Sequence, residues 1–280
     1  MTVVSEVVAS TPVQTAPAEP GASRRMRRAT DAEWIKLRSV RSTVAALCIV
    51  VVGVVGVGAL ICAIRAARWD QVPLDQRLRL DPTNHSLTGW FLGQLVAGVI
   101  GVLAVTSEYG SGLIATTFAA VPRRRTVLAA KAIVVASVVL IVATVTSFAA
   151  FFLGQALMSS TGAQASLGQP GVTRAVIGAA LYVTTIALLG VGLGGVLRST
   201  AAATSALFGL LFVPPILAEA FPPGWRDAIE RWAPMNAGSR MLFVRHASNT
   251  VGPWTGLAVI ASCAAAALAA AAWLIVHRDA

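Results

Sequence analysis

Six apolar segments limit what this chain can fold into. They cover residues 43–64, 89–106, 132–157, 175–197, 201–221 and 254–276, and none contains an arginine, a lysine or an aspartate. A helix that crosses the hydrocarbon core of a bilayer, about 30 Å thick, needs about 20 mostly apolar residues. Backbone groups in lipid must bond within their own segment, and the alternating pattern of a barrel is missing. The sequence therefore predicts an all-α integral membrane protein with six transmembrane helices.

The charged residues agree with this prediction. Apolar residues make up 56% of the chain and charged residues 12%, with a net charge of +10. Because the basic residues gather at the ends of the apolar segments, they indicate membrane anchoring and not nucleic-acid binding. Six helices place both termini on one side, and that side carries 13 of the 22 lysines and arginines. The positive-inside rule then predicts cytoplasmic termini.

The region before the first apolar segment divides into two parts. Residues 1–29 are predicted to form a disordered cytoplasmic tail. Thr30 and Glu33 then fit a capping box, which opens a helix. Apolar and basic residues alternate from there to residue 41, which predicts an amphipathic helix in the plane of the headgroups. An extension of the first spanning helix is the alternative. The residues that define this stretch are Glu33, Trp34, Lys36, Leu37 and Arg38.

Two further segments differ from straight spanning helices. The first loop, residues 65–88, mixes arginines with aspartates and is expected to be solvated.

In the fifth apolar segment Pro214 and Pro215 remove two backbone donors, so we expect a kink or a re-entrant half helix. Glu219 follows near the segment end and is expected to be a hydrated carboxylate. Residues 225–232 then predict a short amphipathic surface helix.

Small residues recur four apart in two of the apolar segments. Gly93, Ala97 and Gly101 do so in the second, and Gly190 and Gly194 in the fourth. This spacing lets two helix backbones approach closely. We expect packing within the chain, with a subunit interface as the alternative.

The loop at residues 108–131 interrupts the apolar pattern with the sequence EYGSGLIATTFAAVPRRRTVLAAK. Ser111 can cap a short helix that ends at Pro122. Its narrow apolar face suits a groove in a partner protein or the membrane surface. The residues on or next to this helix are Glu108, Tyr109, Gly112, Leu113, Ile114, Thr117 and Phe118. The basic residues that follow are predicted to anchor the next helix at the membrane, and they are Arg123, Arg124, Arg125 and Lys131.

Motifs of nucleotide binding and of catalysis are missing from the sequence. No GxxxxGK[ST] motif is present, and the only lysines are Lys36 and Lys131, so the chain has no P-loop of its own. There is no HExxH, and the three cysteines lack CxxC spacing, so neither catalytic residues nor a metal site is predicted.

Two stretches of the sequence resemble the ABC-2 family of ABC transporter permeases. The first is EWIKLRSVRST, which begins at Glu33, and the second is the loop at residues 108–131. APMNAG at residues 233–238 is a weaker match. In the second stretch the matching residues are Glu108, Tyr109, Gly112, Ile114, Thr116, Thr117, Pro122, Arg124 and Lys131.

The resemblance implies a permease subunit of a bacterial exporter in the cytoplasmic membrane. Such a permease pairs with a second copy or a homologue and with two ATPase subunits, which bind ATP and magnesium in its place. Residues 108–121 would be the coupling helix that contacts the ATPase. Residues 30–41 would be the in-plane helix, and residues 214–232, with Pro214, Pro215 and Glu219, an outer gate. There are two alternatives. An integral-membrane enzyme would need catalytic groups that converge in the fold. A secondary transporter would need ionisable residues inside the membrane and an internal repeat.

Overall fold

The computed structural model describes residues 21–39, 41–113, 124–245 and 250–277, and the regular elements in these ranges are all helices. Six of them are long and apolar enough to cross a membrane, which confirms the predicted fold class and helix count. They are α2 (Arg41–Ala67), α5 (Trp90–Gly110), α7 (Arg124–Leu157), α8 (Val172–Leu197), α9 (Thr200–Ala218) and α12 (Pro253–His277).

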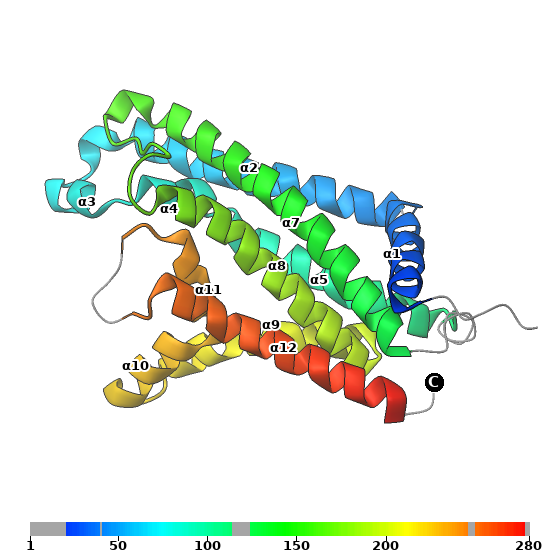
Figure 1. The fold of residues 1–280 in the computed structure, drawn as a ribbon. Coiled ribbons are helices and arrows are strands. Elements are labelled where there is room, and N and C mark those ends of the chain that lie inside the picture. Colours follow the sequence, from blue (N-terminus) through cyan, green and yellow to red (C-terminus); the bar gives the residue numbers. More distant parts are fainter. Residues whose placement is uncertain (1–20, 40, 114–123, 246–249, 278–280) are drawn as a thin grey trace, which may run out of the picture.

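Helix α8 is the centre of the bundle. In its most apolar window 72% of the residues are buried, against 22% in each of α2, α9 and α12. α5, α7 and α12 pack along it (Figure 1). A Cβ atom on Gly101 of α5 would overlap the carbonyl oxygen of Ala187, and one on Gly190 of α8 would overlap that of Gly98. The small residues thus serve packing within the chain, as expected.

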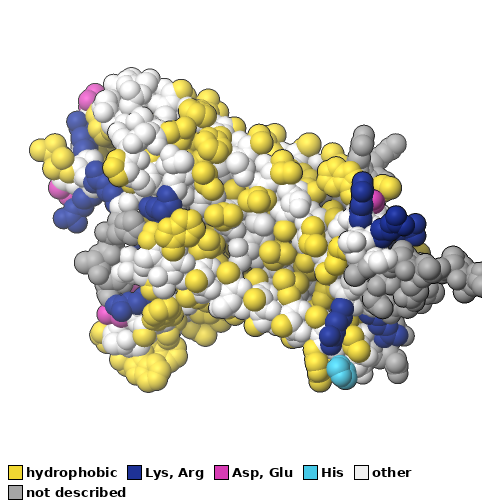
Figure 2. Space-filling view, in the orientation of Figure 1, with side chains coloured by type: hydrophobic (Ala, Val, Ile, Leu, Met, Phe, Trp, Pro, Cys, Tyr) yellow, Lys and Arg dark blue, Asp and Glu magenta, His cyan; other side chains and the backbone are white. Residues whose placement is uncertain are grey.

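The surface of the bundle separates apolar from charged side chains. Figure 2 shows hydrophobic side chains along its flank, whereas lysines and arginines gather at its two ends. One end carries α1 (Ala22–Ser39) and the other carries α3 (Leu74–Arg79), and we call them the α1 end and the α3 end (Figure 1).

Helix α1 lies across the ends of α2 and α7 and does not continue α2 (Figure 1). It begins at Ala22, so the predicted disordered tail is wrong for residues 22–29; residues 1–20 lie outside the described ranges. Thr30 does not cap the helix, because its hydroxyl donates back to Met26 O at 3.1 Å and Arg27 O at 2.8 Å. Alanine, arginine and methionine are good helix formers and extend α1 upstream. That α1 lies in the plane of a membrane stays a prediction.

The two prolines of the fifth segment lie inside α9. Pro214 and Pro215 occupy its last turns, and the helix ends at Ala218. The predicted segment continued to residue 221 and was three residues too long. Glu219 is the exposed C-cap residue, as expected for a hydrated carboxylate. A re-entrant course beyond this point stays a prediction.

A surface helix and a buried helix follow α9. α10 (Pro223–Trp232) confirms the predicted amphipathic surface helix, because it has no buried residue and its Trp225 is 69% exposed. α11 (Pro234–Ser239) is packed more deeply, since Gly238 lies against the ring of Tyr182. The 3₁₀ turn η3 (Arg240–Leu242) leads towards α12.

The connection from α2 to α5 is solvated only in its first half. The 3₁₀ turn η1 (Trp69–Gln71) and α3 have no buried residue. α4 (Pro82–Leu87), in contrast, packs between α2 and α7. A Cβ atom on Gly58 of α2 or on Gly154 of α7 would overlap Ser86 of α4. The prediction of a solvated loop is therefore wrong for α4. This helix fits between α2 and α7 because the residues that face it, Gly58 and Gly154, are small.

Candidate functional site

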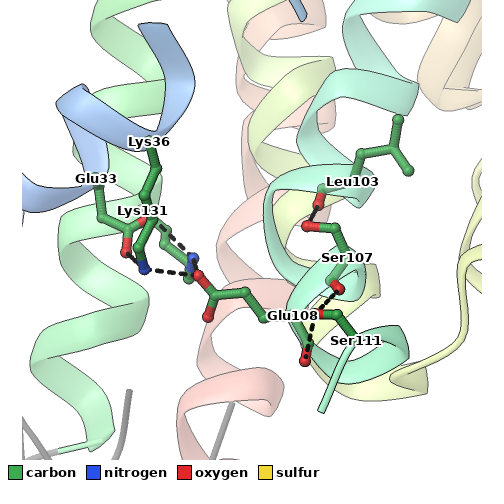
Figure 3. A network of polar contacts seen from close by, with 7 residues as sticks. All are labelled: Glu33, Lys36, Leu103, Ser107, Glu108, Ser111 and Lys131. Atoms are coloured by element: carbon green, nitrogen blue, oxygen red, sulfur yellow. Dashed lines mark hydrogen bonds and ion pairs between the residues drawn. The ribbon is translucent and has the colours of Figure 1, made fainter. Parts of the chain in front are cut away.

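Four charged side chains from three helices meet at the α1 end (Figure 3). Glu33 and Lys36 belong to α1, Glu108 to the last turn of α5, and Lys131 to the first part of α7. Lys131 Nζ donates to Glu33 Oε2 at 2.9 Å and to Glu108 Oε1 at 2.7 Å. Lys36 Nζ donates to Glu33 Oε1 at 2.9 Å and to the same Glu108 oxygen at 2.8 Å. Each lysine bridges the same two carboxylates, and we call these four residues the charge cluster.

The charge cluster is buried except for one lysine. The side chain of Lys131 is 3% exposed and those of Glu33 and Glu108 10% and 9%, whereas Lys36 is 46% exposed. Two positive and two negative charges cancel, which removes much of the cost of burying them. Burial lowers the pKa of Lys36, but its hydrogen bonds to Glu108 and Glu33 and their charges outweigh that effect, so this pKa lies above its ordinary value. Lys36 therefore stays protonated at neutral pH.

The charge cluster closes the base of the loop that connects α5 with α7. Glu108 lies in the last turn of α5, which ends at Gly110, and Lys131 lies inside α7, which begins at Arg124. Their 2.7 Å contact joins the two helices that flank the loop, and Glu33 links both to α1. Buried ion pairs therefore link α5, α7 and α1 at this end of the bundle.

The end of α5 determines how the chain enters this loop. Ser107 donates to Leu103 O at 2.7 Å, and Ser111 donates to Ser107 O at 2.8 Å (Figure 3). Ser111 is thus the C-cap of α5; that it also caps a following helix stays a prediction, because residues 114–123 lie outside the described ranges. Gly112 has a φ of +71°, the left-handed conformation that glycine commonly supplies after a helix end.

Two further contacts join the facing ends of α5 and α7 to other helices. The guanidinium of Arg198, at the C-cap of α8, lies 5.2 Å from the ring centre of Tyr109. Arg124 donates to Ile275 O of α12 at 3.2 Å. The contacts of Tyr109 and Arg124 therefore connect the two ends of the loop to α8 and α12 as well.

The structure places the other predicted site residues as follows. Leu113 is 56% exposed, and Arg125 is exposed in the first turn of α7. Trp34 of α1 is 50% exposed. The predicted coupling helix beyond Leu113, with Ile114, Thr117 and Phe118, lies outside the described residues, as do the predicted anchor Arg123 and the side chains of Leu37 and Arg38. The first residues of that predicted helix, Glu108 and Tyr109, belong to the last turn of α5. Grouping Lys131 with the anchors is wrong, since its amine is buried between two carboxylates.

The predicted gate residues do not belong to this site. α9 begins near the charge cluster, where Thr200 donates to Thr106 of α5 at 2.8 Å. Helices rise about 1.5 Å per residue, so Glu219 lies about 28 Å farther along α9. Pro214 and Pro215 are nearer the same far end. The described part of the predicted coupling segment and the predicted gate residues thus lie at opposite ends of the bundle.

Sequence reasoning named all four members of the charge cluster but not their contact. A usable signal was present, because the chain has only two lysines and both fall in the two family-like stretches. Within the described residues, no group of three histidines, cysteines or acids is placed to hold a metal ion.

Comparison with known protein families assigns the chain to one of them. A family model of ABC-2 family transporter proteins matches residues 30–213, about two thirds of the chain, and this match includes the whole charge cluster. A comparison with curated proteins gives no match. Family members are multi-pass membrane permeases of ABC transporters, which associate with ATP-binding cassette ATPases. The chain belongs to the ABC-2 family of transporter proteins.

Proposed function

We propose that this permease exports a substrate across the cytoplasmic membrane of a bacterium and is driven by ATP hydrolysis in separate ATPase subunits. The observation that carries the proposal is the charge cluster, which joins both ends of the loop at residues 108–131 to α1. A loop closed in this way can receive a push from a partner and pass it to several helices at once.

A movement of the ATPase would displace residues 108–121, and this displacement would be transmitted to α5 and α7. The contact between Glu108 and Lys131 would make both helices move together. Both pack on α8, the most buried helix of the bundle. Rocking of these helices would alternate access to a path between two permeases.

The proposed partners follow from what the chain lacks and from its family. Since the sequence has no P-loop, ATP and magnesium would be bound by two ATPase subunits, and this chain would bind no cofactor. A second permease copy or a homologous permease would complete the path, and the bilayer is the remaining partner. The excess of basic residues on the side of the termini supports a cytoplasmic α1 end.

Co-expression tests the proposal directly. The chain is expressed with and without the ATPase encoded beside it, and both are purified in mild detergent. We expect the two proteins to co-purify and to hydrolyse ATP in a vanadate-sensitive manner. Isolation without an ATPase, together with transport that does not need ATP, would refute ATP coupling and favour a secondary transporter. Conversion of a lipid by the permease alone would favour a membrane enzyme.

A set of substitutions tests the docking site itself. Replacing Leu113, Ile114 and Phe118 with serine removes the apolar face of residues 108–121, so ATPase association should be lost while membrane insertion stays intact. The matched control replaces Leu74 and Leu78 with serine, because they are 71% and 65% exposed at the α3 end. If the control lost as much ATPase as the test variant, the assigned docking surface would be wrong.

A further inference from the structure

Helix α1 has two unlike faces. Ala29 and Glu33 are buried towards the bundle, and Glu33 belongs to the charge cluster. The opposite face follows the spacing i, i+3, i+4, i+7, i+10 and i+11, which lines one side of a helix. Its six residues are all exposed, and they are Arg24, Arg27, Arg28, Asp31, Trp34 and Ile35. We call this set the outward face.

The outward face changes in character along the helix. Its first half carries three arginines, with Asp31 as its one acid, so its net charge is +2. Its second half is apolar, since Trp34 is 50% and Ile35 66% exposed. Arginines near tryptophan and isoleucine are typical of helices that meet both the headgroups and the upper acyl chains of a bilayer.

The connection to α2 keeps this face close to the membrane. Residue 40 alone separates α1 from α2, and the candidate span of α2 begins at Val44. An 18-residue helix is about 27 Å long. Because α1 turns across the ends of α2 and α7 (Figure 1), this length extends sideways over the bundle end. The whole helix can therefore lie at the depth of the headgroups.

We propose that the outward face binds anionic phospholipids of the leaflet at the α1 end. Arg24, Arg27 and Arg28 would bind the phosphate groups, and Trp34 and Ile35 would enter the leaflet beside them. An acidic protein would match the arginines but not the exposed apolar half, which favours lipid. Because Glu33 holds the buried face of α1 to Glu108 through the lysines, lipid binding would also bias the loop at residues 108–131. This last step alone rests on the proposed function.

Thermal unfolding of the purified permease measures the lipid preference. The full chain in neutral detergent is titrated with dioctanoyl phosphatidylglycerol or, separately, with dioctanoyl phosphatidylcholine. Each arginine near an anionic surface adds about a fivefold gain in affinity. Replacing Arg24, Arg27 and Arg28 with glutamine should therefore raise the half-saturating concentration of phosphatidylglycerol about 100-fold. The midpoint without lipid should change little, because these side chains are exposed.

A first control distinguishes the effect of the arginines on the outward face from the effect of the protein's overall charge. Arg65, Arg68 and Arg79, three exposed arginines outside α1, are replaced with glutamine and should leave the phosphatidylglycerol effect intact. Arg27→Lys should retain most of the affinity that Arg27→Gln loses. Equal shifts with both lipids in the wild type would overturn the proposal. So would a triple variant that keeps its lipid response but no longer binds the ATPase, which would identify a protein-docking face. The lipid titration itself uses the permease alone, so its result does not depend on whether an ATPase binds the chain.

Discussion

The two lysines of the charge cluster should differ greatly in their contribution to stability, although they bridge the same carboxylates. Lys131→Met takes a buried ammonium from Glu33 and Glu108, leaving a net negative charge and, among the described residues, no donor to Glu33 Oε2. Removing one partner from a buried ion pair costs about 3–5 kcal/mol. Lys36→Met leaves the same net charge, but it removes the half-exposed partner, which water can replace, and both carboxylates keep Lys131; it should therefore cost less than about 1 kcal/mol.

Thermal unfolding in detergent measures this contrast. In a domain of this size about 1 kcal/mol moves the midpoint by about 2–4 °C. Lys131→Met should therefore lower the midpoint by about 6–20 °C, and Lys36→Met by less than about 4 °C. The double variant Lys131→Met with Glu33→Gln removes the orphaned carboxylate as well. It should recover part of the loss, because the two sites are in contact and their effects are not additive.

Two outcomes would refute this reasoning. If both lysine variants lowered the midpoint equally, burial would not decide the strength of these ion pairs. If the double variant were as unstable as the sum of its single changes, Glu33 and Lys131 would not be coupled.

Three further substitutions test other contacts. Gly101→Leu should separate α5 from α8 and prevent a stable fold, whereas Gly53→Ala, with nothing within 4 Å of its Cβ position, should leave the unfolding midpoint unchanged. Gly112→Ala places a side chain at a φ of +71° and should cost about 1–2 kcal/mol of local strain, seen as faster proteolysis of the loop at residues 108–131 with the bundle intact. Tyr182→Phe removes a 2.6 Å hydrogen bond to buried Gln94 and should lower stability by about 1–3 kcal/mol; an unchanged midpoint would show that Gln94 has another donor.

The architecture could be predicted because the length and composition of a spanning helix are local properties of the sequence. Among the spanning helices, the largest error in a boundary is at α7, which begins at Arg124 and not at residue 132. The predicted start at residue 132 was chosen to exclude Lys131, because an isolated lysine is costly in hydrocarbon. In the folded chain Glu33 and Glu108 neutralise it, and these partners lie 98 and 23 residues away in sequence. A pattern of neighbouring residues cannot contain them.

Burial of polar segments was harder to predict for the same reason. α4 has the sequence PTNHSL, which is typical of a solvated loop. It is buried because Gly58 and Gly154 on two other helices leave room for it. In the site, the spacing of residues 108–131 predicted a functional loop, but not the ion pair between Glu108 and Lys131 or the link of both residues to α1. The docking residues Ile114, Thr117 and Phe118 stay predictions.

The scarcity of lysine makes the charge cluster chemically addressable. Lys36 and Lys131 are the only lysines in the chain, and all other strongly basic side chains are arginines. Apart from the terminal amine, an amine-selective reagent can therefore modify only this one place. Lys36 is partly accessible, whereas Lys131 is shielded for as long as α1 stays on α7. Labelling of Lys131 over time would thus report, in a native membrane and without an introduced probe, how often these helices separate.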